Sequence, residues 1–187
     1  MRSRVLIALA AAMLAAAATS AFAQKVNVST SLGDIVVELN AAKAPKTVDN
    51  FLQYVKAGHY DGTVFHRVIG NFMIQGGGFA PDLKEKATRA AIPLESRNGL
   101  SNNRGTLAMA RTSDPNSATA QFFINVQDNT FLDAAQSRDG NGYAVFGKVV
   151  SSMDVVDRIR AVQTGNRGGF QDVPLQPVTI IKATVAP

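Results

Sequence analysis

Short runs of β-strand sequence, separated by turn residues, fill most of this chain and restrict its fold more than any other feature. Residues 26–30 alternate apolar and polar side chains as a half-buried strand does, and residues 35–39 resume the strand pattern after a Leu32-Gly33-Asp34 turn. This opening is therefore predicted to be an antiparallel hairpin. Further strand patterns follow at residues 63–69, 72–75, 106–110, 121–126, 143–150 and 178–185.

Only two stretches have helical periodicity. The first begins at Pro45, a residue suited to the first turn of a helix, and ends near Gly58. Its apolar face is formed by Val48, Phe51, Leu52 and Val55. A second helix is expected over about residues 152–162. Two helices among many strands, without regular β-α alternation, argue against a parallel α/β fold. We expect a mainly β fold, a closed antiparallel barrel with helices over its ends, because closure removes exposed strand edges.

The stretches between these elements have turn and loop composition. Residues 79–92 are polar and charged, which predicts an exposed loop. The Gly76-Gly77-Gly78 run predicts an irregular chain reversal that needs small residues, since no Lys-Ser/Thr pair follows it to complete a phosphate loop. Residues 166–169 are expected to be a loop, with Pro174 and Pro177 after it.

The first 23 residues have the three parts of a secretory signal peptide. Arg2 and Arg4 give a basic start, residues 5–18 are apolar, and Ala21-Phe22-Ala23 is a small-x-small cleavage site. The alternative is a transmembrane anchor, because the uncharged run up to Gln24 is just long enough to span a bilayer. The cleavage site favours removal. The expected product is residues 24–187, a single domain exported to the periplasm and free of the membrane.

Composition excludes several kinds of site. The chain of 187 residues has no cysteine, which rules out disulfides, thiolate metal ligands and a cysteine nucleophile. Its two histidines, His59 and His66, make a zinc site improbable, so no metal is expected. The net charge of +5 includes Arg2 and Arg4 of the predicted leader, which leaves little excess for binding nucleic acid. Neither a nucleophile elbow nor a dinucleotide motif is present.

One ribbon, residues 65–78, concentrates the residues that could perform chemistry. It carries a permanent cation in Arg67, an amide in Gln75, and the large apolar side chains of Phe72 and Met73. None of these is a nucleophile. A cation and an amide beside an apolar surface suit the binding and polarising of a neutral carbonyl or amide. The alternative is a core hairpin with Arg67 solvated at its edge. His66 neighbours Arg67 but is expected on the other strand face, as a structural residue.

The same ribbon carries a family resemblance. Phe65-His66-Arg67 through Gln75-Gly76-Gly77 resembles the cyclophilin family of peptidyl-prolyl cis-trans isomerases. Further blocks match in order, namely Gly105-Thr106-Leu107-Ala108-Met109-Ala110, Gln121-Phe122-Phe123-Ile124, Phe131-Leu132-Asp133 and Val145-Phe146-Gly147-Lys148-Val149. With its leader and the Ala108-Met109-Ala110-Arg111-Thr112 run, the chain is similar to periplasmic bacterial members. The resemblance implies an eight-stranded antiparallel barrel capped by two helices.

The resemblance also implies roles for individual residues. Arg67 would be the catalytic cation, and Gln75 would be the second catalytic residue. Gln75 and Gln121 would hydrogen-bond the substrate. The proline pocket would be lined by Phe72, Met73, Phe123 and Leu132. The backbone at Ala110 and Arg111 would align the residue before proline.

Several positions depart from the better-known eukaryotic pattern. Phe131 stands where many members have Trp, which predicts weak binding of cyclosporin-type ligands. Tyr143 stands where a pocket His is common, and Arg111 replaces an Asn that acts mainly through its backbone. Gly70-Asn71 replaces the usual Pro-Gly, which changes the turn but not the pocket residues.

The function implied by the resemblance is rotation of X-Pro bonds in unfolded or newly exported polypeptides, without cofactor, metal or covalent intermediate, by a monomer. One alternative is a non-catalytic proline-peptide binding module or holdase chaperone that uses the same pocket. Retention of Arg67, Gln75 and Gln121 favours the enzyme. Another alternative, a nucleic-acid binder, requires a clustered cationic face, whereas basic residues here alternate with acidic ones.

Overall fold

The computed structural model describes residues 24–186, and the predicted leader, residues 1–23, lies outside the described residues. Most of the described chain is strand and loop, as expected. The strands are β1 (Lys25–Thr30), β2 (Gly33–Leu39), β3 (Phe65–Ile69), β4 (Met73–Gly76), β5 (Thr106–Met109), β6 (Phe122–Asn125), β7 (Val145–Ser151), β8 (Thr164–Arg167), β9 (Phe170–Pro174) and β10 (Ile180–Val185). The helices are α1 (Pro45–Lys56), the 3₁₀ turn η1 (Thr130–Leu132) and α2 (Met153–Arg160).

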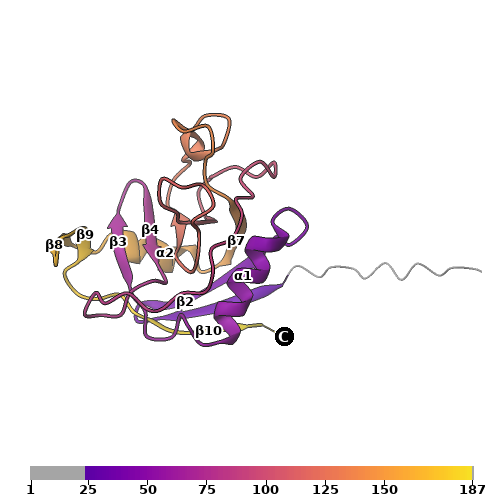
Figure 1. The fold of residues 1–187 in the computed structure, drawn as a ribbon. Coiled ribbons are helices and arrows are strands. Elements are labelled where there is room, and N and C mark those ends of the chain that lie inside the picture. The colour runs from indigo at the N-terminus through magenta and orange to yellow at the C-terminus, as the bar shows by residue number, and fades with distance from the viewer. Residues whose placement is uncertain (1–23, 187) are drawn as a thin grey trace, which may run out of the picture.

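Eight strands form one antiparallel sheet in the order β10-β1-β2-β7-β5-β6-β4-β3 (Figure 1). The opening hairpin is confirmed, with Val28 paired to Ile35. The predicted closed barrel is wrong, because the sheet curls without closing. Its ends, β10 and β3, meet only through the isolated bridge between Val64 and Thr179 and the backbone hydrogen bonds beside it. Beyond that contact β3 lies against β9 while β10 runs along β1, so the two end strands share no continuous ladder.

The two predicted α-helices are present, each within two residues of its expected bounds. α1 has Pro45 in its first turn and buries Val48, Phe51, Leu52 and Val55, the apolar face predicted from the sequence. α1 packs against β10, and α2 packs against β2, β3 and β4. The helices therefore cover parts of the curled sheet that would otherwise expose apolar side chains to water.

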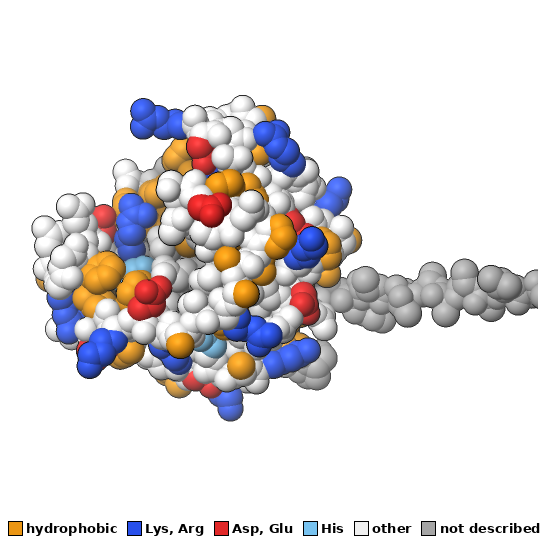
Figure 2. All heavy atoms as spheres, in the orientation of Figure 1, with side chains coloured by type: hydrophobic (Ala, Val, Ile, Leu, Met, Phe, Trp, Pro, Cys, Tyr) orange, Lys and Arg blue, Asp and Glu red, His pale blue; other side chains and the backbone are white. Residues whose placement is uncertain are grey.

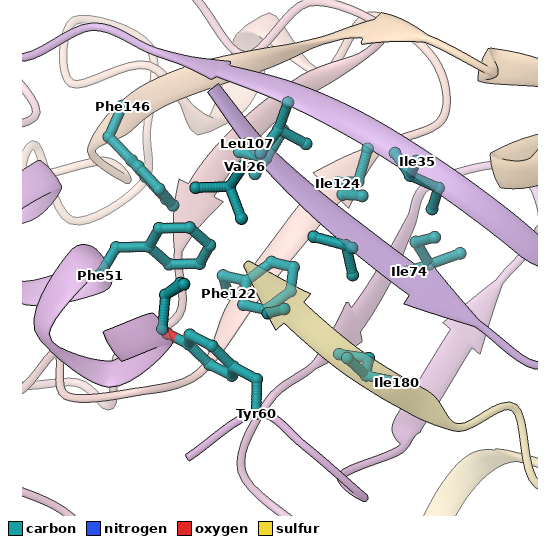
Figure 3. Close-up of a cluster of buried hydrophobic side chains, with 14 of the residues drawn as sticks. Val26, Ile35, Phe51, Tyr60, Ile74, Leu107, Phe122, Ile124, Phe146 and Ile180 are labelled. Atoms are coloured by element: carbon teal, nitrogen blue, oxygen red, sulfur yellow. The ribbon is translucent and has the colours of Figure 1, made fainter. Parts of the chain in front are cut away.

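The main core lies inside the curl. Figure 3 shows Phe51 of α1 and Tyr60 converging with Phe122, Phe146, Ile124 and Ile180 of the sheet. The ring of Phe51 is 5.5 Å from that of Phe122 and 5.2 Å from that of Phe146, measured between centroids. The Phe51–Phe122 contact is edge-to-face, an arrangement that adds to the hydrophobic stabilisation of a core.

A two-stranded hairpin, β8–β9, replaces the loop predicted around residues 166–169. Arg167 pairs with Phe170, so Gly168 and Gly169 form a two-residue turn. Both glycines have positive φ, 56° and 84°, as a hairpin turn matched to the strand twist requires. The strands were missed because β8 is polar and mostly exposed, and β9 is short and does not alternate apolar and polar side chains. The hairpin lies beside β3, at the left of Figure 1.

Candidate functional site

The strand register creates a second apolar cluster on the sheet face opposite the main core. Arg67, Gln75, Phe123, Ala108 and Val145 form one row across five adjacent strands, because each is paired with the next. Side chains alternate between faces along a strand, so most of the chain neighbours of these residues, such as Ile74, Phe122 and Leu107, point into the main core. We call this second group the outer cluster, which consists of Met73, Ala108, Phe123, Leu132 and Val145 with Ile69, Phe72, Leu100, Ala110 and Tyr143 packed around them.

Arg67 stands at one end of this row, on β3. Its partner across the ladder is Gln75 of β4, so the predicted cation and amide lie side by side. The Arg67 side chain is 42% exposed, and its Nε atom lies 4.0 Å from the Asp172 carboxylate of β9. A pair this long and this exposed neutralises the guanidinium only in part. Arg67 therefore remains available to a ligand at the surface.

The two predicted amide residues contact each other. Gln75 Nε2 donates a hydrogen bond of 3.0 Å to Gln121 Oε1. Gly78 leaves room for this arrangement, because a Cβ at that position would lie 2.5 Å from Cγ of Gln121. The conformation of the glycine run confirms the predicted need for small residues, since Gly77 has φ +86°. The side-chain oxygen of Gln75 and the side-chain nitrogen of Gln121 take no part in this hydrogen bond, so both can bind a peptide group.

Aromatic and aliphatic side chains form the apolar part of the site. Phe72 stacks on Phe131 at a centroid distance of 5.7 Å, and Phe123 meets Tyr143 edge-to-face at 5.6 Å. Leu132, at the end of η1, completes the cluster. Phe131 is 53% exposed, so the stacked pair forms an apolar edge that faces solvent. The structure thus brings Phe72, Met73, Phe123, Leu132, Phe131 and Tyr143 into one neighbourhood, as predicted.

A buried amide network beneath the pocket holds Phe72. The Asn129 side chain is fully buried and donates a 2.7 Å hydrogen bond to the Phe72 carbonyl. It also donates to Asn125 Oδ1 at 2.8 Å, and Asn125 in turn donates to Asn102 at 3.2 Å. Buried polar groups of this kind specify one geometry when they are satisfied. Sequence analysis missed this network, because nothing in a single sequence distinguishes a buried Asn from one in a turn.

The predicted positions Ala110 and Arg111 follow β5. The Ala110 N–H donates to the Gln121 carbonyl at 3.0 Å, which places this backbone beside the two glutamines. The Arg111 side chain is only 3% exposed and forms an ion pair with Asp139. It therefore does not extend into the solvent in front of the pocket.

His66 is buried, as expected of a structural residue, but the ladder register shifts between Phe65 and Arg67, so the strict alternation assumed for the prediction does not hold at His66. Its ring lies 4.5 Å from the Phe79 ring, and Phe79 in turn contacts Phe170 of β9 at 5.1 Å. Burial first, and the neighbouring charge of Arg67 second, lower the pKa of His66 to about 4. A neutral, enclosed imidazole suits packing rather than proton transfer at neutral pH.

Asp172 is the charged neighbour of Arg67 that sequence analysis missed. It lies on β9, and the signal that could have found β9 is Gly168-Gly169, a dipeptide typical of two-residue hairpins. Phe170 anchors the strand on Phe79, and two residues later Asp172 reaches Arg67. Asp172 has φ +58°, a left-handed conformation that Asp tolerates better than most residues.

Other candidate sites have less support. Within residues 24–186, no group of three or more His, Asp or Glu side chains is placed to hold a metal ion, and no helix there is long and apolar enough to cross a membrane. A cavity of about 750 Å³ lies between the β2–α1 turn, residues 99–103 and β7, and none of the predicted site residues lines it. On the face in Figure 2, basic side chains are scattered among acidic ones.

The described site therefore offers a partly exposed guanidinium, two linked amides and an apolar surface. It can grip a small apolar ring and hydrogen-bond the carbonyls on either side of it. It can also present a fixed positive charge to an atom that develops a lone pair. The part of the site built from these residues holds no nucleophile and no proton donor tuned to neutral pH, so bond cleavage is not the chemistry that it favours.

Comparison with known proteins gives a consistent result. The family described as "Cyclophilin type peptidyl-prolyl cis-trans isomerase/CLD" matches residues 25–185. Peptidyl-prolyl cis-trans isomerase cyp18 of Streptomyces antibioticus is 61% identical and covers 86% of this chain and 97% of its own length. Peptidyl-prolyl cis-trans isomerase B of Escherichia coli is 58% identical and covers 84% of this chain and 96% of its own length. Both relatives are bacterial, which points to a bacterial origin.

A solved structure has the same fold. It is a cyclophilin type peptidyl-prolyl cis-trans isomerase of Cryptosporidium parvum, crystallised in the presence of the dipeptide Ala-Pro. The TM-score is 0.76 at 27% sequence identity, and the match covers 88% of this chain and 99% of that one. The similarity therefore extends over most of the chain.

Proposed function

Because the chain belongs to the cyclophilin family of peptidyl-prolyl cis-trans isomerases, we propose that its isomerase activity resides in the outer cluster and that Arg67 is the catalytic residue. The substrates are proline-containing polypeptides, whose pyrrolidine ring occupies the apolar surface formed by Phe72, Met73, Phe123 and Leu132. The Ala-Pro dipeptide present with the Cryptosporidium parvum relative supports this substrate class.

The reaction needs stabilisation of a twisted amide. Amide resonance gives the peptide bond a rotation barrier of about 18–20 kcal/mol. Uncatalysed X-Pro isomerisation therefore takes roughly 10–100 s at room temperature. Rotation by 90° removes the resonance and leaves the prolyl nitrogen pyramidal, with a localised lone pair. A donor aimed at that lone pair stabilises the twisted state and not the planar one, so it lowers the barrier.

Arginine suits this role because its guanidinium is always protonated and has several N–H donors in a fixed plane. Gln75 lies across the ladder from Arg67, and Gln121 is bonded to Gln75, so both amides can hold substrate carbonyls while the bond rotates. The apolar surface holds the ring and the other side of the bond turns. No covalent intermediate, metal or cofactor takes part in this mechanism.

The register of the sheet is the observation that carries the assignment. Arg67, Gln75 and Phe123 are consecutive partners across β3, β4 and β6, so a cation, an amide and an aromatic wall occur in one row on one face. A non-catalytic proline-peptide module would need the aromatic wall alone. The half-exposed cation beside it supports the enzyme.

We also propose where the protein acts in the cell and in what form. The basic start, apolar run and Ala21-Phe22-Ala23 site support export to the periplasm with residues 1–23 removed, after which residues 24–187 assist folding of newly exported proteins as a monomer. Cyclosporin-type ligands are expected to bind weakly, because Phe131 has no indole N–H with which to donate a hydrogen bond.

The proposal is tested by NMR exchange on a short Ala-Pro peptide, which follows both isomers without a coupled protease. We expect wild-type protein to accelerate exchange and Arg67→Ala to lose about 100- to 1,000-fold of that acceleration, the effect typical of removing one transition-state donor. The control is peptide affinity, which is expected to change far less. Equal losses of exchange and thermal stability in Arg67→Ala would contradict the assignment. Peptide binding without accelerated exchange in the wild type would instead indicate a binding module.

A further inference from the structure

The Arg111 side chain is a buried charge with an unusually complete set of partners. Its Nε donates to the Gly142 carbonyl and its Nη1 to the Thr112 carbonyl, each at 2.9 Å. Its Nη2 forms the ion pair with Asp139. The guanidinium carbon lies 4.6 Å from the centre of the Tyr143 ring, within the range of a cation–π contact. The residue therefore ties the segment 139–143 to the end of β5.

The segment that Arg111 holds includes one wall of the pocket. Tyr143 faces Phe123 with its ring edge-to-face, and its backbone N–H donates to the Leu132 carbonyl at 3.0 Å. The turn before it is fixed by Asp139, whose Oδ1 accepts hydrogen bonds from the backbone N–H groups of Asn141 and Gly142. These N–H groups and the Arg111 guanidinium hold the pKa of Asp139 well below its usual range.

The turn itself has little freedom to move. Gly142 has φ +66°, and a Cβ there would lie 2.5 Å from the Ala134 nitrogen and 2.7 Å from the Leu132 carbonyl oxygen. Residues 132–134 and 142–143 are thus in direct backbone contact. A displacement of Tyr143 would therefore also disturb Leu132, the second wall residue.

We propose that the Arg111 side chain is a positioning residue, which sets the width of the proline pocket by clamping Tyr143 between its guanidinium and the ring of Phe123. This inference rests on the proposed function and adds to it. Arg111 replaces the Asn usual at this position, and Tyr143 replaces a common His, so the two departures form one structural unit. The clamp serves ring binding and not the rotation step, because Arg67 stands at the other end of the row, on β3.

A lysine substitution separates this role from charge alone. Arg111→Lys keeps the positive charge and the backbone but loses the planar surface over Tyr143 and the fork that reaches Gly142, Thr112 and Asp139 together. We expect the peptide dissociation constant to rise about tenfold, which corresponds to the loss of one desolvated cation–π contact or its equivalent. The isomerisation rate at saturating peptide should stay within about twofold of wild type, since catalysis by Arg67 is retained.

The matched control is Arg104→Lys. Arg104 also pairs with an aspartate, Asp157 at 2.8 Å, and also donates to a backbone carbonyl, that of Val126, but its ion pair is with α2 and not with the pocket. If replacing a multiply bonded guanidinium by an ammonium weakened peptide binding only through a general loss of stability, both variants would bind the peptide equally weakly. We expect Arg104→Lys to lower the thermal midpoint without changing peptide affinity.

The measurements are peptide titration by NMR and exchange at saturation, on wild type, Arg111→Lys and Arg104→Lys. Weaker binding in Arg111→Lys alone, with the saturated rate kept, supports the clamp. Unchanged affinity in Arg111→Lys, or equal weakening in Arg104→Lys, overturns it. A saturated rate that falls in step with the affinity also overturns it, since the residue would then act on rotation. If wild-type protein binds but does not accelerate exchange, the proposed catalytic function fails while the affinity comparison still tests the clamp.

Discussion

Phe122 and Phe123 are adjacent in the chain and differ completely in what surrounds them. Phe122 points into the curl of the sheet, where the rings of Phe51, Tyr60 and Phe65 lie around it. Phe123 points to the opposite face and meets Tyr143, with Gln75 and Ala108 as its ladder partners. The same strand thus serves the main core with one side chain and the outer cluster with the next.

The difference lies in how each face is covered. Helices α1 and α2 cover parts of the curled sheet, and Phe51, Phe65, Phe122 and Phe146 are at most 1% exposed. The outer cluster is covered by loops, and its edge includes Phe131, which is half exposed. A closed apolar face stabilises a fold, whereas an open apolar face with a cation at its edge provides a binding surface. The predictions below test this division, from the largest effect to the smallest.

Substitutions of the two phenylalanines should separate stability from binding. Phe122→Ala removes a ring from a closed core and is expected to lower the free energy of unfolding by about 4 kcal/mol. Phe123→Ala is expected to lower it by about 3 kcal/mol, because Phe123 packs against one ring, that of Tyr143, whereas Phe122 packs against three. Peptide affinity should fall strongly only in Phe123→Ala. Urea unfolding and peptide titration measure the two quantities.

The milder Phe122→Leu and Phe123→Leu pair serves as the control where Phe122→Ala does not fold. A loss of peptide affinity in Phe122→Leu equal to that in Phe123→Leu would show that the two faces are not independent.

Acidification should destabilise the fold through His66. Its pKa of about 4 in the folded protein lies below the ordinary value of 6.5, so the unfolded chain binds the proton more readily. Stability from this group is therefore fully present above about pH 6.5 and is lost as the pH falls towards 4, a loss of about 3 kcal/mol. Urea midpoints between pH 7 and pH 4 measure it. His66→Leu should flatten the dependence, and an unchanged slope in that variant would assign the effect elsewhere.

Removing the charge of Asp172 should have the smallest effect. Asp172→Asn leaves the hairpin intact but removes the anion 4.0 Å from Arg67 Nε. Exposed pairs contribute about 0–1 kcal/mol, so kcat/KM should fall by no more than about fivefold, with stability nearly unchanged. Asp154→Asn, which breaks an exposed pair with Arg158 on α2, is the control and should leave kcat/KM as it is. An increase in kcat/KM would mean that Asp172 restrains Arg67 instead of orienting it.

Much of the fold could be predicted because local patterns decide it. Alternation in residues 26–39, the apolar face after Pro45 and the strand patterns at 106–110 and 121–126 each correspond to an observed element. Barrel closure was predicted wrongly. Closure depends on whether β10 pairs with β3 along its length, and a local sequence pattern does not determine the pairing of strands so far apart in the chain.

The residues of the site could be named from the sequence, but their arrangement could not. Alternation shows that Phe122 and Phe123 face opposite ways, yet only the register shows that Phe123, Gln75 and Arg67 form one row. Asp172 was missed because β9 is short and does not alternate apolar and polar side chains. The Arg111 contacts with Gly142 and Asp139 were missed because they join segments about 30 residues apart.

The division between the two faces can be measured directly with methionine methyl groups. Residues 24–187 contain three methionines, Met73, Met109 and Met153. Met73 belongs to the outer cluster, Met109 to the main core, and Met153 packs against the main core from α2. An NMR titration of methyl-labelled protein with an Ala-Pro peptide is predicted to shift and broaden the Met73 signal while those of Met109 and Met153 stay in place. A response at Met109 or Met153 equal to that at Met73, or none at Met73, would contradict a binding surface on the outer face.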